Sequence, residues 1–183
     1  MVSDVPTVFS PEDDLIFNSS RLLVFFETFS NIKPLNGIDR ERLCYYDFFA
    51  SNPFIITRKQ DPLWLKLEMT GLDPFKLEYQ SASQRYSTKR ESIKQYLALL
   101  VAKGLITVTN EDSRILYSIT PMGKETAQKI TTLYAITYRK SVRLILDILG
   151  KFTDSELWTH ASKWFEAKTF LIDLYNLVDD ADE

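Results

Sequence analysis

The spacing of apolar side chains predicts helices in the first part of the chain. Residues 19 to 29, SSRLLVFFETF, place apolar side chains three and four positions apart, which indicates a short buried helix, with strand as the competing interpretation. A second helix is predicted for RERLCYYDFFAS, with Asp39 as its N-cap. We expect it to end at Asn52-Pro53, because the residue before a proline disfavours helical backbone.

In the middle of the chain, a predicted helix passes directly into predicted strands. The helix runs from about Lys89 to Lys103 with Ser87 or Thr88 as its N-cap, and Gly104 stands where a left-handed C-cap residue is favoured. Its apolar stripe consists of Ile93, Leu97, Leu100 and Val101. LITVT and RILYSIT follow as two short strands joined by the turn-rich NEDS. This order is typical of the recognition helix and wing of a winged helix-turn-helix domain.

The last third of the chain is predicted to be a helical extension. Thr120-Pro121 combines a capping hydroxyl with proline at the first helical position, and the helix it opens has few breakers before Gly150. Thr153 and Glu156 have capping-box spacing and predict a last helix that runs to about Val178.

The segment from 54 to about 85 is the least regular. LWLKLEM and FKLEY alternate apolar and polar residues with a strand-like period, so we interpret it as an insertion of short pieces, with a β-hairpin as the alternative. The expected fold is mainly α with a small β-hairpin (α+β). The expected parts are an N-terminal arm (1–17), a winged-helix core with this insertion (18–120), and C-terminal helices with an acidic tail (121–183).

Composition narrows the class of protein. The chain has 183 residues of which 45% are hydrophobic, enough for a real core. The net charge of −3 provides no overall attraction for nucleic acid. One cysteine excludes an internal disulfide, and there is neither a signal-peptide pattern nor an uncharged apolar run long enough to span a membrane. We therefore expect a cytoplasmic protein with no membrane association.

The residues needed for catalysis are scarce. His160 and Cys44 are the only residues of their types, and the five glycines form no phosphate-binding loop. Three acids, Asp61, Glu68 and Glu78, are interpreted as part of a solvated face because lysines alternate with them. We expect no catalytic residues, no metal, no cofactor and no small-molecule substrate.

One stretch carries the chemistry of nucleic-acid binding. Bases cluster near the predicted start of the helix at Lys89, where side chains and helix dipole together attract phosphate. The candidate contacts are Lys89, Arg90, Lys94 and Gln95. The turn between the strands is acidic, with Glu111 and Asp112, and an acidic turn repels the phosphate backbone. This opposition disfavours sequence-specific DNA reading.

The C-terminal helices carry more apolar surface than a winged core of about 65 residues covers. Exposed aromatic residues on such helices are typical of contacts with another chain. The candidates for partner contact are Tyr134, Tyr138, Trp158, Trp164 and Tyr175.

Four stretches together follow the pattern of one family. They are RLCYYDFFASNPFII (42–56), YSTKRESIKQYLALLVAKGLI (86–106), YSITPMGKETA (117–127) and LYAITYRKSVRLIL (133–146). From about residue 19 to 150 the chain resembles the middle component of ABC-three-component bacterial conflict systems, the group that contains the small accessory subunit of Lamassu-type antiphage defence. The most discriminating stretch is YYDFF before a variable insertion.

The resemblance implies a non-enzymatic subunit of a hetero-oligomeric complex. Its implied partners are a Rad50/SMC-like ATPase and a nuclease-type effector, which it would bridge, holding the effector inactive until the ATPase senses foreign DNA. DNA would be met mainly through the complex. The alternative is a winged-helix transcriptional regulator that dimerises through its C-terminal helices.

Overall fold

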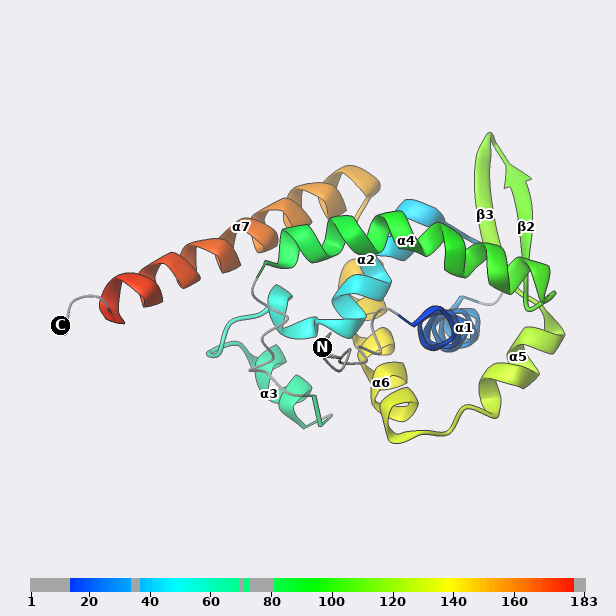
Figure 1. The fold of residues 1–183 in the computed structure, drawn as a ribbon, viewed down its shortest axis with the longest axis horizontal. Helices are drawn as coiled ribbons and strands as arrows, with labels where there is room; N and C mark the ends of the chain where they lie inside the picture. Colours follow the sequence, from blue (N-terminus) through cyan, green and yellow to red (C-terminus); the bar gives the residue numbers. More distant parts are fainter. Residues whose placement is uncertain (1–13, 34–36, 70, 73–80, 180–183) are drawn as a thin grey trace, which may run out of the picture.

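The computed structural model describes residues 14–33, 37–69, 71–72 and 81–179, with side chains described as far as residue 166 (Figure 1). The predicted N-terminal arm, 1–17, lies almost wholly outside the described residues. Its last residues are helical, because α1 (Leu15–Ile32) begins where the Asp14 carboxylate accepts a 2.6 Å hydrogen bond from the Phe17 N–H.

The first helix is buried around most of its circumference. The predicted helix over 19–29 is confirmed and extends further at both ends, and the run Leu22–Phe26 is buried at every position. A helix that is apolar all round needs neighbours on all sides. α1 contacts α4, α5, α6 and the sheet, and it is therefore the centre of the core.

The second predicted helix is confirmed with its cap. α2 (Arg40–Ser51) begins at Asp39, whose carboxylate accepts a 2.9 Å hydrogen bond from the Arg42 N–H. It ends at Asn52, and a short 3-10 helix, η2 (Pro53–Ile56), follows.

The predicted hairpin is confirmed and belongs to a three-stranded antiparallel sheet. β2 (Ile106–Glu111) and β3 (Arg114–Ile119) pair along their whole lengths, and β1 (Ile38–Asp39) adds to the other edge of β3, in the order β1-β3-β2. Asp112 and Ser113 form the two-residue turn, with φ of 48° and 65°, which suits the right-handed twist of a hairpin. The fold is thus mainly helical with a small sheet, an α+β class, as predicted.

The long helix before the hairpin starts much earlier than predicted. α4 (Ala82–Ala102) extends well upstream of Lys89, and Ile93, Leu97 and Leu100 are buried as expected. Val101, predicted to be core, is 39% exposed. Gly104 takes a φ of +66°, and the Leu105 N–H donates to the Leu100 carbonyl at 2.9 Å, which completes a Schellman C-cap.

The insertion contains a helix where its sequence period indicated a strand. α3 (Pro62–Glu68) has proline in its first turn and buries Trp64 and Leu67, three positions apart. The alternation of LWLKLEM was misleading because Leu65 and Met69 are exposed. FKLEY lies outside the described residues.

The single helix predicted from 121 to 150 is two helices. α5 (Pro121–Gln128) begins at the predicted Thr120 cap, and α6 (Leu133–Leu149) has its own cap, in which Thr132 Oγ1 accepts from the Ala135 N–H at 3.2 Å. Arg139 Nη1 and Nη2 donate to the carbonyls of Ile130 (2.9 Å) and Ala127 (2.7 Å). These bonds stabilise the break, because the last carbonyls of α5 need partners.

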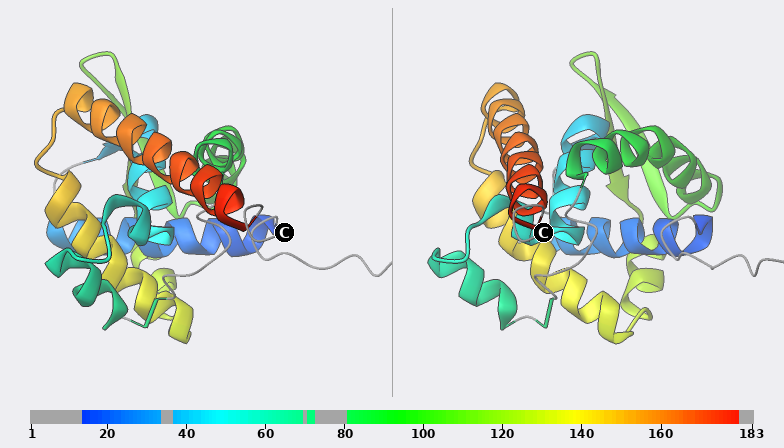
Figure 2. Two further views of the ribbon diagram at one scale, coloured as in Figure 1. Left: turned by 90° about the vertical axis from the view of Figure 1, so that its left-hand side faces the viewer. Right: turned by 60° about the vertical axis from the view of Figure 1, so that its left-hand side comes forward.

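The last helix begins with the predicted capping box. The Thr153 N–H donates to Glu156 Oε2 at 2.8 Å and the Glu156 N–H to Thr153 Oγ1 at 3.3 Å, at the start of α7 (Asp154–Asp179). Figures 1 and 2 show α7 leaving the body of the molecule towards its C-terminal end. The last residues of the predicted acidic tail lie outside the described residues.

Candidate partner-binding site

A buried charge cluster holds the helices in place. Asp47 on α2 has no exposed surface; Arg21 of α1 donates to it at 3.1 and 3.2 Å, and Lys89 Nζ of α4 lies 2.8 Å from its Oδ2. The Tyr138 hydroxyl of α6 also donates to this carboxylate. Burial alone would raise the pKa of Asp47, but the Arg21 and Lys89 cations outweigh burial and hold the pKa well below its usual range.

Lys89 is a core residue and not a surface base. Its ammonium also lies 3.2 Å from the Asp47 carbonyl oxygen and 3.2 Å from Ser51 Oγ. Burial, together with repulsion from Arg21, lowers the pKa of Lys89 to about 8. The expectation that Lys89 projects towards phosphate at a helix start is corrected, because α4 begins about two turns earlier and Lys89 contacts Asp47 and Ser51 of α2.

The other candidate nucleic-acid contacts lie on the exposed side of α4. Lys94 and Gln95 are exposed, whereas Arg90 Nε pairs with Glu41 Oε2 at 2.7 Å. Their contact with nucleic acid stays a prediction.

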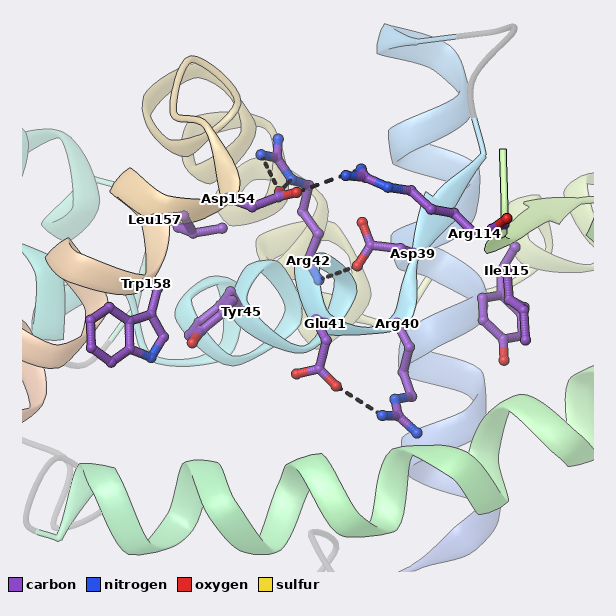
Figure 3. Close-up of a pocket in the computed structure, with 12 residues that line it drawn as sticks. Asp39, Arg40, Glu41, Arg42, Tyr45, Arg114, Ile115, Asp154, Leu157 and Trp158 are labelled. Carbon is purple, nitrogen blue, oxygen red and sulfur yellow. Dashed lines mark hydrogen bonds and ion pairs between the residues drawn. The ribbon is translucent and has the colours of Figure 1, made fainter. Parts of the chain in front are cut away.

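A groove of about 650 Å³ lies between the hairpin, the start of α2 and the start of α7 (Figure 3). We call it the hairpin groove. Its apolar lining consists of Tyr45, Ile115, Tyr117, Leu157 and Trp158. Trp158 is 63% and Ile115 56% exposed. In Figure 3 these two side chains stand on opposite sides of the groove.

The charges that line the hairpin groove are largely paired with one another. Arg42 Nη2 lies 2.7 Å from Asp154 Oδ1 and Arg40 Nη2 lies 2.9 Å from Glu41 Oε1. Arg42 also donates to the Phe152 carbonyl at 2.8 Å and thereby holds the start of α7 against α2. A groove with apolar walls and internally neutralised charges suits an apolar segment of another protein better than a nucleic acid.

A second apolar surface lies at the beginning of α6. The rings of Phe17 and Tyr134 are 5.1 Å apart, which brings the start of α1 to the start of α6. Large apolar side chains on these two helix starts are exposed, Leu133 most of all at 80%. We call this surface the α1–α6 patch; it consists of Leu15, Ile16, Leu133, Tyr134 and Ile136.

The predicted partner residues are distributed unevenly over the molecule. Trp158 lines the hairpin groove and Tyr134 belongs to the α1–α6 patch. Tyr138 is corrected to a core residue, because it is 3% exposed and bonded to Asp47. Trp164 is half-buried against Phe49. The side chain of Tyr175 lies outside the described residues.

Sequence reasoning missed most of the groove and the patch. Ile115 was expected only as a strand residue, and Leu133 as one apolar residue in a continuous helix. A signal for Leu133 was present in the preceding Thr132, a capping residue that marks a helix start. No local signal places the hairpin beside α7, because that contact joins distant segments.

His160 and Cys44 are residue types that often act in catalysis, and both are packed against other side chains here. The His160 ring is stacked on Phe152, with centroids 4.6 Å apart, and on Trp164. Burial, with the nearby Glu41 and Asp47 carboxylates, raises the pKa of the Cys44 thiol to about 12, so that it is protonated at neutral pH. Within the described residues no group of three or more His, Cys, Asp or Glu could hold a metal ion, and no helix is long and apolar enough to cross a membrane.

Comparison with known families assigns the chain to one family. Exposed apolar surfaces, such as those on the small sheet and on the helix ends of this chain, are typical of sites that bind other proteins. The family model for the ABC-three component (ABC-3C) system Middle Component 2 matches residues 17–169, and the chain belongs to this family. It is an accessory subunit of a multi-component system. Comparisons with curated proteins and with solved structures each found no match.

Proposed function

We propose that the chain is a non-enzymatic adaptor of a bacterial antiphage or antiplasmid complex of the Lamassu type. It joins an SMC/Rad50-like ATPase to a nuclease-type effector in the cytoplasm. The observation that carries this proposal is the presence of two apolar surfaces at opposite ends of one helix. The α1–α6 patch lies where α6 begins, and the hairpin groove lies next to where α6 ends and α7 begins.

The separation of the two surfaces suits a bridging role. α6 has 17 residues, which corresponds to a length of about 25 Å at the α-helical rise. Two partners seated at its two ends therefore have room to bind together. Tyr138 and Asp47 fix α6 to α2, so that the spacing between the surfaces is held rigidly. Such an adaptor holds the effector inactive at a fixed position on the ATPase until the ATPase meets foreign DNA.

A winged-helix core supplies the frame of this adaptor. The order α1-β1-α2-α4-β2-β3, with the sheet order β1-β3-β2, supports it, and α3 is then an insertion between the second and third helices of the motif. Its recognition helix is α4. In the proposed adaptor this helix is fixed by Lys89 to the core and DNA is contacted mainly by the partners.

The absence of catalysis in the proposal is supported by where the perturbed groups lie. Perturbed pKa values often mark active sites, but Asp47 and Cys44 are buried in the helical core, and the Lys89 side chain, 14% exposed, is paired with Asp47. Two groups that line the hairpin groove are also shifted: burial would raise the pKa of Glu41, but hydrogen bonds from Arg90 and Arg40 lower it, and burial would lower the pKa of Arg42, but Tyr46 and Asp154 raise it. Their surroundings explain the shifts as structural.

Co-purification with the products of neighbouring genes tests the proposal. Tagged wild-type chain is expected to retain both an ATPase and an effector. Trp158→Ala in the groove is expected to weaken one partner and Leu133→Asp in the patch the other. Leu65→Asp is the matched control, because Leu65 is 62% exposed on α3 and outside both surfaces. Retention of neither partner by the wild type would overturn the proposal.

A DNA-reading regulator is the second candidate, and the exposed Lys94 and Gln95 on α4 favour it. It predicts salt-dependent binding of the isolated chain to a palindrome, lost in Arg90→Ala/Lys94→Ala. On the adaptor proposal, that double variant leaves partner retention unchanged.

A further inference from the structure

We propose that the free edge of β2 pairs with the β2 edge of a second copy of the chain, so that two hairpins form one continuous antiparallel sheet across a two-fold axis. This inference goes beyond the adaptor function, since it needs no other subunit. It concerns a surface that neither the hairpin groove nor the α1–α6 patch includes.

The edge of β2 is open from Thr107 to Glu111. β2 pairs with β3 on one side only, and its residues from Thr107 to Glu111 are all exposed. Natural edge strands are usually blocked by lysine, proline, a bulge or a covering element. The sequence of β2, ITVTNE, has no lysine or proline and is rich in β-branched residues that favour strands. Figure 1 shows the hairpin projecting away from the helices, which leaves this edge accessible.

The backbone direction of each β2 residue follows from the turn. In a hairpin with a two-residue turn, the residues that flank the turn, here Glu111 and Arg114, form a hydrogen-bonded pair. Alternation then directs the N–H and C=O groups of Thr107, Thr109 and Glu111 towards β3. The Thr120 N–H donates to the Leu105 carbonyl at 3.1 Å, so Leu105 is also directed towards the β3 side, as this alternation requires. The outward groups therefore belong to Ile106, Val108 and Asn110.

The two-fold axis restricts the register. An axis perpendicular to the sheet keeps each face on its own side, so that opposite residues must have side chains on the same face. Placing Val108 opposite Val108 of the second copy meets this condition. It also places Asn110 opposite Ile106, which is 2% exposed at the base of the hairpin, so that the pairing is centred on the exposed Val108. Val108, which is 44% exposed, is then covered by its own counterpart.

The charges favour a second copy in this antiparallel orientation. The turn carries Glu111 and Asp112, and Lys103 lies at the base of the same hairpin; all three are exposed. Antiparallel pairing brings the acidic turn of one copy beside Lys103 of the other, twice per dimer. Parallel pairing would instead bring the two acidic turns together.

Sedimentation equilibrium of the full chain without any partner tests this pairing. Wild type is expected to dimerise reversibly, and Val108→Pro to weaken the dimer more than about tenfold, because it removes the central outward N–H. Val108→Thr, which keeps the N–H and the β-branched shape, is the matched control and is expected to dimerise. Circular dichroism checks that each variant is folded. A monomeric wild type, or an unaltered dimer in folded Val108→Pro, would overturn the proposal.

Charge reversal provides a second measurement that leaves the hairpin backbone unaltered. Glu111→Lys and Lys103→Glu are each expected to weaken the dimer severalfold, and the double variant to recover much of the loss. Equal or additive losses without recovery would contradict the antiparallel arrangement. Because no ATPase or effector is present, failure here leaves the adaptor proposal standing, and failure of that proposal leaves this one standing.

Discussion

At the residue scale, Asp47 combines complete burial with a full charge. Its carboxylate is contacted by three side chains, Arg21 of α1, Lys89 of α4 and Tyr138 of α6. Four helices, α1, α2, α4 and α6, therefore meet at this one group. A buried ion pair contributes little net stability compared with apolar packing, but removing one partner leaves the others desolvated without a counter-charge. Asp47 therefore sets how these helices are placed relative to one another.

We predict that Asp47→Asn lowers the free energy of unfolding by about 3–5 kcal/mol, because Arg21 and Lys89 then face a neutral amide in the core. Urea denaturation measures the change. Asp147→Asn on the exposed side of α6 is the control, with an expected change below about 0.5 kcal/mol. Equal changes in the two variants would contradict the role of Asp47.

The Asp47 carboxylate also makes the free energy of unfolding depend on pH in the acidic range. Its pKa is lowered in the folded protein, so the unfolded chain takes up this proton first and the stabilisation is lost as pH falls below the ordinary aspartate value of about 4. We predict that the stability difference between wild type and Asp47→Asn shrinks as the pH falls below about 4. Urea titrations at several pH values check this, and a constant difference down to pH 2 would contradict it.

The burial and the contacts of individual residues were the features that the sequence predicted least well. YYDFF stands out in the sequence, but nothing local shows that its aspartate is buried or that Lys89 and Tyr138 are its partners. Both partners look like surface residues on an amphipathic helix. The pairing depends on helices distant in sequence and is visible only in the folded chain.

At the element scale, four of the predicted capping positions were confirmed, whereas the N-cap predicted at Ser87 or Thr88 was wrong because α4 begins at Ala82. The caps at Asp39, Thr120 and Thr153 and the stop at Gly104 were all confirmed, since each is satisfied by hydrogen bonds within a few residues. The helix start before Ala82 and the helical insertion around Trp64 were not predicted, because they depend on burial against distant elements.

Gly104 is predicted to be required for the passage from α4 to the hairpin. Gly104→Ala places a Cβ on a backbone with φ of +66° and 3.2 Å from Met122 Cε. We expect a loss of about 1–2 kcal/mol in urea denaturation, and a smaller loss for Gly104→Asn, because asparagine tolerates the left-handed region. Equal stability of the alanine variant and wild type would contradict this account.

Arg139 is predicted to maintain the break between α5 and α6. It caps the carbonyls of Ala127 and Ile130 and pairs with Glu27 at 3.1 Å. Arg139→Lys cannot make these contacts together, and we expect a loss of about 1–3 kcal/mol and faster amide exchange around residues 129–135. Arg143→Lys, on an exposed position of the same helix, is the control and is expected to leave both measurements unchanged.

At the scale of the whole molecule, two apolar surfaces separated by α6 support the adaptor proposal. The sequence predicted an excess of apolar surface on the C-terminal helices, and Tyr134 and Trp158 do lie on exposed surfaces. It did not predict that the hairpin and α2 complete the groove around Trp158, or that α1 completes the patch around Tyr134. Both surfaces are assembled from segments that are distant in sequence.

The most direct test of the adaptor claim is native mass spectrometry of the chain co-purified with its two neighbour-encoded partners. The wild type is predicted to give a complex that contains all three proteins. Trp158→Ala and Leu133→Asp are predicted to give two different binary complexes, each lacking a different partner, while Leu65→Asp gives the full complex. Loss of the same partner in both surface variants, or of neither, would contradict a two-surface adaptor.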